Sequence, residues 1–132
     1  MKQKVITLIP EAVIEEGQYL TISVQPELLP KLAAMLRNEE GFDYLISLIG
    51  MDWGDSLGVI YYIARSAKQE EIIILKTATA DRENPQLYTV SDLWKTADLN
   101  EREVFGLLGI RFINHHDMRR LYLQDTWKGY PL

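Results

Sequence analysis

The chain has 132 residues, of which 47% are apolar and 25% are charged, as expected for one ordinary globular domain. It contains no cysteine, which excludes a disulfide scaffold, cysteine-ligated zinc and any Fe–S cluster held by this chain alone. The net charge of −5 argues against nucleic-acid binding.

The charge is unevenly distributed, with a net charge of −6 in residues 1–100 and of +1 in residues 101–132. The first apolar run is broken at Pro10 and followed by acidic residues, so it does not resemble a signal peptide. No other run approaches the ~18–20 apolar residues that span a bilayer. We therefore expect a cytoplasmic chain, or one held at a membrane by its partners.

In chain order, the first half predicts strands and one amphipathic helix. Leu28, Leu32 and Leu36 recur at helical spacing after Pro26 and predict a helix over 26–39. Gly41 is predicted to cap the C-terminus of this helix. The run 42–51 fits a strand or a buried helix segment, and we favour a strand ending near 52–53. The predicted strands of this half are 5–9, 19–24 and 42–51.

The second half predicts two more strands, at 59–64 and 72–79, and then a loop at 81–85. Capping-box patterns at Thr89-x-x-Asp92 and Asp98-x-x-Glu101 predict helix starts within 89–108. Gly109 fits the left-handed position after a helix.

These elements predict an α+β, two-layer domain, in which helices back a mixed sheet of four or five strands. A short strand-like segment at 110–112 follows the last helix. We place the domain at 1–113 and an extended, partner-binding tail at 114–132, because the tail has few periodic apolar residues.

The Glu101-Arg102-Glu103 cluster is the sharpest local signal. On a helix, Glu101 and Glu103 lie about 200° apart, so they cannot act together as paired catalytic carboxylates. The plainer interpretation is a helix N-terminus whose acidic residues complement the helix dipole.

His115 and His116 are adjacent, and adjacent side chains in a strand point to opposite sides. Asp117 and Asp125 are near in sequence, but no Cys, Glu or third His completes a metal set, so we expect no metal site. Contact or capping by a neutral imidazole is the favoured interpretation.

The remaining candidate residues lie in the tail. Arg119 and Arg120 can bind phosphate or acidic groups, or simply be solvated. Trp127 and Tyr130, beside Pro131, suit either docking on a partner or packing on the domain's own sheet. The sequence has no phosphate-binding glycine loop and no Ser or Cys nucleophile pattern.

The order E-R-E, G-I-x-F, H-x-D-x-R-R, W-x-G-x-P-L resembles the C subunit of proton-translocating NADH:quinone oxidoreductase, respiratory complex I. The chain departs from that pattern at Leu99, Gly106, His116 and Met118, and Asn114 replaces a Gly. The matching residues are Ala97, Glu101, Arg102, Glu103, Gly109, Ile110, Phe112, His115, Arg119, Arg120, Trp127, Gly129, Pro131 and Leu132.

The resemblance implies a non-redox structural and assembly subunit of the peripheral arm. Such a subunit packs beside the D and B subunits near the quinone-reduction site, on the cytoplasmic side of the inner membrane. NADH, FMN, Fe–S clusters and quinone would then belong to partner subunits. The chain would be part of an oxidoreductase and translocase without activity of its own.

Several alternatives remain open at this point. The chain fits standard complex I, a related hydrogenase or quinone-linked dehydrogenase, and part of a C–D fusion. It could also be a free-standing acid–base enzyme using Glu101, Glu103 or the His pair. A small-molecule-binding α+β module is a further possibility.

Overall fold

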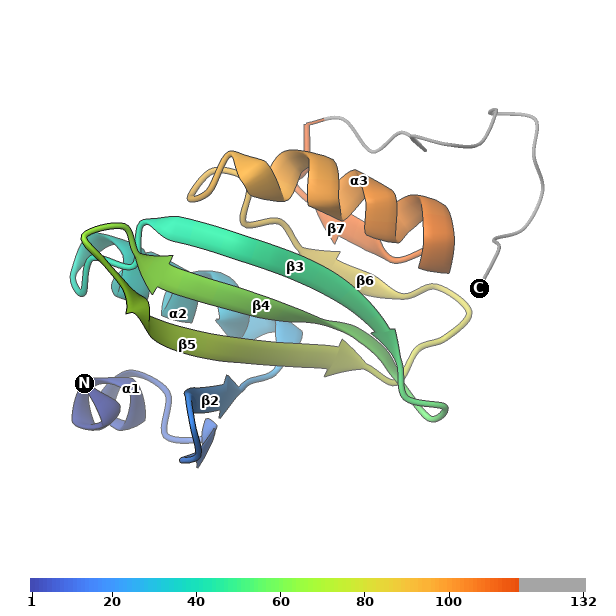
Figure 1. Cartoon of the computed structure of the whole chain (residues 1–132). Helices are drawn as coiled ribbons and strands as arrows, with labels where there is room; N and C mark the ends of the chain where they lie inside the picture. The colour runs from blue at the N-terminus through green and yellow to red at the C-terminus, as the bar shows by residue number, and fades with distance from the viewer. Residues whose placement is uncertain (117–132) are drawn as a thin grey trace.

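A computed structural model describes residues 1–116, except the side chains of residues 69 and 70; residues 117–132 lie outside it (Figure 1). The helices are α1 (Lys2–Leu8), the short 3-10 helix η1 (Pro26–Leu28), α2 (Leu29–Asn38) and α3 (Thr96–Leu108). The strands are β1 (Val13–Glu15), β2 (Leu20–Ser23), β3 (Tyr44–Asp52), β4 (Leu57–Arg65), β5 (Lys68–Thr79), β6 (Gln86–Tyr88) and β7 (Arg111–Ile113).

The main sheet has five strands in the order β1-β2-β5-β4-β3. Strands β2 and β5 are parallel and the other neighbours are antiparallel, so the sheet is mixed, as predicted. One row across it aligns Leu48, Tyr61, Leu75 and Ile22, all buried. This row belongs to the face that forms the hydrophobic core.

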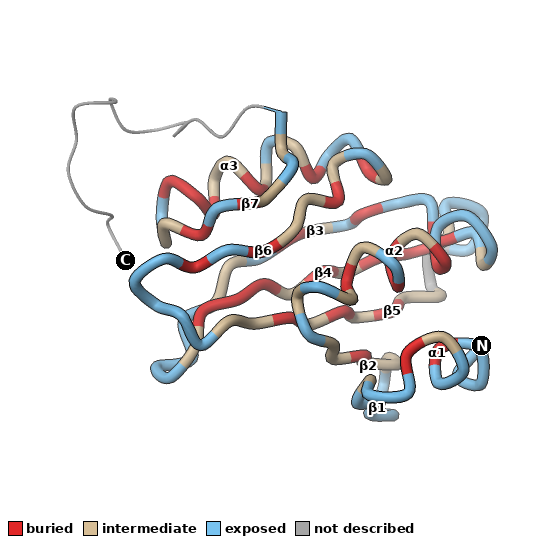
Figure 2. The backbone as a smooth tube through the Cα atoms, turned by 180° about the vertical axis from the view of Figure 1, so that it is seen from behind, coloured by how far each residue is buried: buried red, intermediate tan, exposed pale blue. Residues whose placement is uncertain are grey.

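Helices α1 and α2 cover that core face, and among residues 1–116 no helix lies on the opposite face of the sheet (Figures 1 and 2). The predicted helix over 26–39 is confirmed as η1 followed by α2. Its apolar spacing buries one side of α2 against the sheet. The buried residues of α2 are Leu29, Leu32, Ala33, Met35 and Leu36.

A second, two-stranded sheet pairs β6 with β7 in parallel, and α3 is the crossover between them. Helix α3 also packs on β3, because the glycine at Gly50 leaves room for it. A Cβ added there would lie 2.7 Å from Leu108 Cδ1 and 3.1 Å from Val104 Cγ1. The β-α-β unit is thereby attached to the edge of the main sheet.

Two predicted elements are wrong. Residues 5–9 do not form a strand: α1 ends at Leu8, and Val5 and Ile9 are buried while Ile6 is exposed, which is helical spacing. The predicted helix start at Thr89 lies in irregular backbone that precedes a turn at residues 91–93, and α3 begins only at Thr96.

The predicted left-handed glycine is confirmed. Gly109 has φ of 77° and its N–H donates to the Phe105 carbonyl at 2.9 Å, which closes α3. The short strand after it is β7. Within residues 1–116, no helix combines the length and apolar character required to cross a bilayer.

Candidate functional site

Three of the predicted motif residues, Glu101, Arg102 and His115, lie near the carboxyl ends of the parallel strands β6 and β7. Figure 1 shows these two strands with α3 beside them. Residues 89–91 follow β6, residues 114–116 follow β7, and the first half of α3 lies beside both segments. A β-α-β crossover brings these three segments together, and the carboxyl ends of parallel strands are where α/β proteins commonly place functional groups. We therefore describe this end of the unit as the candidate site.

Glu101 is fully buried within α3. Its carboxylate accepts a hydrogen bond from the Val90 N–H at 2.9 Å and another from the Thr89 hydroxyl. Burial raises the pKa of Glu101 to about 7, the two hydrogen bonds oppose that rise, and the nearby acidic side chains of Asp98 and Asp92 add to it. The carboxylate therefore ties α3 to the turn after β6.

The helix-dipole interpretation of the acidic cluster is wrong for Glu101, because this residue is buried in the helix interior rather than solvated in the first turn. Glu103 is only half-buried, in keeping with the wide separation of the two acids around the helix. Asp98 is the acidic residue of the first turn.

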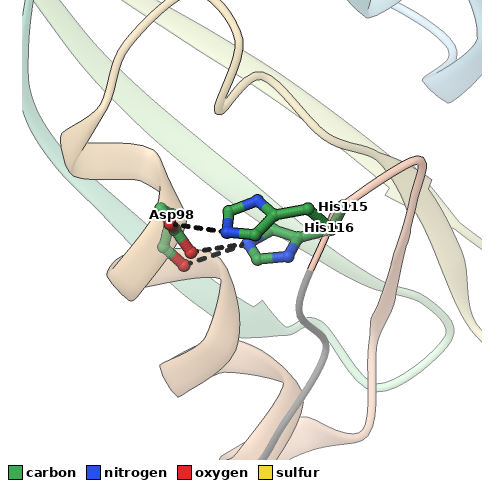
Figure 3. A group of neighbouring side chains, drawn as sticks. All are labelled: Asp98, His115 and His116. Atoms are coloured by element: carbon green, nitrogen blue, oxygen red, sulfur yellow. Dashed lines mark hydrogen bonds and ion pairs between the residues drawn. The ribbon is translucent and has the colours of Figure 1, made fainter.

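Asp98 and the two histidines form a compact cluster at the surface (Figure 3). His115 Nε2 lies 3.0 Å from Asp98 Oδ1 and 3.2 Å from the Asp98 carbonyl oxygen. His116 Nε2 lies 3.3 Å from Asp98 Oδ2. The His115 side chain is fully buried, whereas that of His116 is 68% exposed.

The expectation that the two imidazoles point to opposite sides is wrong. Their rings are stacked, with centroids 4.9 Å apart and planes 9° apart, and both face Asp98. The chain has left the strand at this point, because Asn114 has a positive φ of 72°. Asn tolerates that left-handed conformation better than most residues.

Charged groups of both signs surround the cluster. Arg102 Nε lies 3.5 Å from Asp98 Oδ1, one helical turn along α3. His115 Nε2 is 3.8 Å from Glu101 Oε1. His116 and Asp98 also line a shallow pocket of about 320 Å³ with Ser91, Asp92 and Lys95.

A second feature is the uncovered face of the main sheet. Ile49 of β3 pairs with Ile60 of β4, and Tyr62 of β4 pairs with Ile74 of β5, all on this face. Ile49 is 45% exposed and the other three are half-buried. The site prediction missed this face, although unbroken apolar runs at 59–64 and 72–75 indicate strands that bury both sides.

Comparison with known families matches residues 22–132 to the family described as "Respiratory-chain NADH dehydrogenase, 30 Kd subunit". The chain belongs to this family. The match spans most of the chain and confirms the resemblance noted from the sequence, that is, to the C subunit of complex I.

Related proteins carry matching names. The chain is 49% identical over 112 residues to the C/D subunit of NADH-quinone oxidoreductase from Phocaeicola vulgatus, covering 84% of this chain and 21% of that protein. It is 29% identical to the C subunit of the same enzyme from Moorella thermoacetica, covering 98% and 88% of the two chains. It is 34% identical to the chloroplastic J subunit of NAD(P)H-quinone oxidoreductase from Chaetosphaeridium globosum, covering 85% and 68%. The chain thus spans about a fifth of the C/D relatives.

Two solved structures share the fold. One is a trypsin-resistant fragment of Nqo5, with a TM-score of 0.73 and 24% identity over 88% of this chain and 97% of that one. The other is an archaeal membrane-bound sulfane sulfur reductase, with a TM-score of 0.78 and 17% identity over 95% and 75%. At these identities the likeness establishes the α+β fold alone.

Most of the described residues of the family motif stabilise the β-α-β unit. Glu101 and Phe112 are buried, Gly109 closes α3, and His115 is buried against Asp98. Arg102 pairs with Asp98, and Glu103 lines an open depression between α3 and β3. The tail residues Arg119, Arg120, Trp127, Tyr130 and Pro131 lie outside the described residues.

Proposed function

We propose that this chain is a non-redox structural and assembly subunit in the peripheral arm of an NADH:quinone oxidoreductase. In this proposal it packs beside the D- and B-type subunits near the quinone-reduction site, on the cytoplasmic side of the membrane. It supports electron transfer from NADH to quinone, coupled to proton translocation, without taking part in the chemistry.

The uncovered apolar face of the main sheet carries this proposal. Ile49, Ile60, Tyr62 and Ile74 lie together on a face that no described helix covers. Contiguous apolar surface of this kind marks interaction sites in soluble proteins. A partner subunit that packed on this face would remove the exposed side of Ile49 from water.

The names of the relatives favour the D-type subunit as a neighbour. Several relatives are named as a combined C/D subunit, and this chain matches about a fifth of their length. Joining two parts in one chain gives each a high effective concentration near the other, which favours contact between them. We therefore expect direct contact between this chain and the D-type subunit.

The absence of cysteine supports the assignment of Fe–S clusters to partner subunits. NADH and FMN are assigned to partners as well, since the sequence lacks a phosphate-binding glycine loop, and quinone is assigned to partners by the family resemblance. The isolated chain is accordingly expected to have no oxidoreductase activity.

The geometry disfavours the alternative of a free-standing acid–base enzyme that uses Glu101. Its side chain is fully buried and its two oxygens are engaged by Thr89 and Val90. A general acid or base must come within hydrogen-bond reach of a substrate, and Glu101 has no open path to one.

Co-expression of the chain with the D- and B-type subunits tests the proposal, with co-purification as the readout. Ile49→Lys should reduce co-purification severalfold, because a charge would be buried in an apolar contact. Val13→Lys is the matched control, since Val13 is also apolar and 57% exposed but lies on β1 at the other edge of the sheet.

Equal co-purification of Ile49→Lys and wild type would contradict the assignment of this face as the interface. Failure of the wild-type chain to co-purify with either partner would contradict the proposed function itself. Arg119→Ala combined with Arg120→Ala tests the separate expectation that the tail binds the D-type subunit, and it should also reduce co-purification.

A further inference from the structure

We propose that Asp98, His115 and His116 form a binding site for one divalent transition-metal ion of the zinc class. The ligands would be the Nε2 atoms of the two imidazoles and one oxygen of the Asp98 carboxylate, with water completing the coordination. The site is independent of the proposed interface, which lies on the uncovered face of the main sheet.

The distances from the two imidazoles to the Asp98 carboxylate are close to the ligand separations of a tetrahedral site, although each imidazole contacts a different oxygen. With metal–ligand distances of about 2.0–2.2 Å, two tetrahedral ligands lie roughly 3.3–3.6 Å apart. The Asp98 carboxylate oxygens lie 3.0 Å from His115 Nε2 and 3.3 Å from His116 Nε2. All three ligand atoms fall within 4.8 Å of one another, and the two stacked imidazoles would rotate out of their parallel arrangement to point both Nε2 lone pairs at one ion.

The backbone holds the cluster in place. Asp98 is in the first turn of α3, and His115 is buried beside it. The left-handed conformation of Asn114 turns both imidazoles toward the same carboxylate. A ligand held by packing, such as His115, loses less conformational freedom on binding than an exposed one.

The site is open on one side, which allows a metal ion to enter. His116 is largely exposed, and it lines the shallow pocket that Asp98 also borders. Two imidazoles and one carboxylate leave a fourth position for water, as in zinc sites with three protein ligands. The mixed nitrogen and oxygen set favours zinc, cobalt or nickel over magnesium or calcium, which prefer oxygen ligands.

Some of the surrounding charges favour a bound cation and others oppose it. The carboxylates of Asp92 and Glu101 favour a bound cation, whereas Arg102, which pairs with Asp98, and Lys95 oppose it. On binding, the metal would replace the contacts that Asp98 makes with the two imidazoles. Each coordinating nitrogen would contribute its lone pair and release any proton it holds to solvent.

Zinc titration of the 132-residue chain, freed of any affinity tag, tests the proposal by calorimetry. The expected result is one zinc ion per chain and a higher thermal midpoint in its presence, because the ion would bind the folded state. Visible absorption of added Co²⁺ would report coordination by nitrogen in a site of low symmetry. Absence of stoichiometric binding would overturn the proposal.

Variants then assign the ligands. His116→Ala and Asp98→Asn should each weaken zinc binding by at least about tenfold. His116 is the safer variant for folding, since its side chain is exposed. Asp92→Asn is the matched control, because it removes the same charge beside the site without removing a proposed ligand. Unchanged affinity in either ligand variant, or an equal loss in the control, would overturn the proposal.

Discussion

The Glu101 carboxylate in α3 accepts a hydrogen bond at 2.9 Å from the backbone N–H of Val90, eleven residues earlier in the chain. The Thr89 hydroxyl donates a second hydrogen bond to the same carboxylate. Together these bonds fix the turn after β6 to the helix that carries Asp98. Glu101 therefore acts on the candidate site by positioning its segments.

Glu101→Ala should lower the free energy of unfolding by about 1–3 kcal/mol, because it leaves the buried Val90 N–H without its acceptor. Urea denaturation of the purified chain measures this change. Glu101→Gln keeps an acceptor oxygen of similar shape and should cost less. Glu103→Ala is the control on the half-buried side of the helix, with a smaller expected effect. A Glu101→Ala variant as stable as wild type would contradict the positioning role.

Asn114→Ala should destabilise the chain by about 1 kcal/mol, because alanine is strained at a φ of 72°. Asn114→Gly should retain near wild-type stability, since glycine adopts this conformation freely. Thermal unfolding compares the two variants. Equal thermal midpoints for the alanine and glycine variants would show that the left-handed backbone at Asn114 is not needed for stability.

Gly58→Ala should be among the most damaging small substitutions in the sheet. The added Cβ would meet the Thr77 carbonyl oxygen and lie 2.8 Å from Ala78 Cα, both backbone atoms that cannot move aside cheaply. Overpacking of this kind costs about 1–3 kcal/mol or more. Gly17→Ala has no atom within 4 Å and serves as the control. Equal denaturation midpoints for the two variants would contradict this account of the β4–β5 packing.

The ion pair between Asp52 and Arg82 should make the free energy of unfolding fall at acid pH. Arg82 donates hydrogen bonds of 2.7 and 3.0 Å to the two oxygens of Asp52, and the arginine lowers the pKa of Asp52 to about 2. Because the folded pKa lies below the unfolded value of about 3.9, this stabilisation is present above pH 4 and is lost as pH falls toward 2.

Denaturation of wild type and Asp52→Asn across this pH range tests the linkage. The stability difference between them should shrink as the pH approaches 2, and it should also diminish at high salt because both side chains are 40% exposed. Arg82→Ala should reproduce the effect. If the stability difference between wild type and Asp52→Asn stayed constant from pH 5 to 2, the Asp52–Arg82 ion pair would not be the source of the pH dependence.

Local sequence patterns correctly predicted elements that have a long apolar repeat or a residue suited to one particular backbone conformation. The apolar spacing of Leu32 and Leu36 predicted α2, and Gly109 predicted the left-handed end of α3. The prediction of a strand at 5–9 was wrong because five consecutive apolar or β-branched residues fit both the two-residue repeat of a strand and the 3.6-residue repeat of a helix. The helix places Val5 and Ile9 together in the core.

The candidate site depends on contacts that no local pattern encodes. The Thr89 hydroxyl could have capped a helix, but Glu101, twelve residues later, is its partner. Asp98 meets His115 only because β6 and β7 are parallel neighbours with α3 between them. Adjacent histidines alone gave no sign that Asp98, from another element, contacts both of them, and the tail expectations fall outside the described residues.

Strand β2 pairs with its chain neighbour β1 but contacts the rest of the sheet only through the distant β5, where Leu20 pairs with Ile73, so we expect β2 to join the sheet after β5 has formed. Strands β3, β4 and β5 follow one another and can assemble earlier as successive hairpins. In stopped-flow experiments, Ile63→Val should therefore mainly slow folding, whereas Ile22→Val should mainly speed unfolding. The opposite pattern would reverse this order of assembly. The sheet of this chain would thus be completed from β4 outward, and its amino-terminal edge would be the last part to close and the first to open.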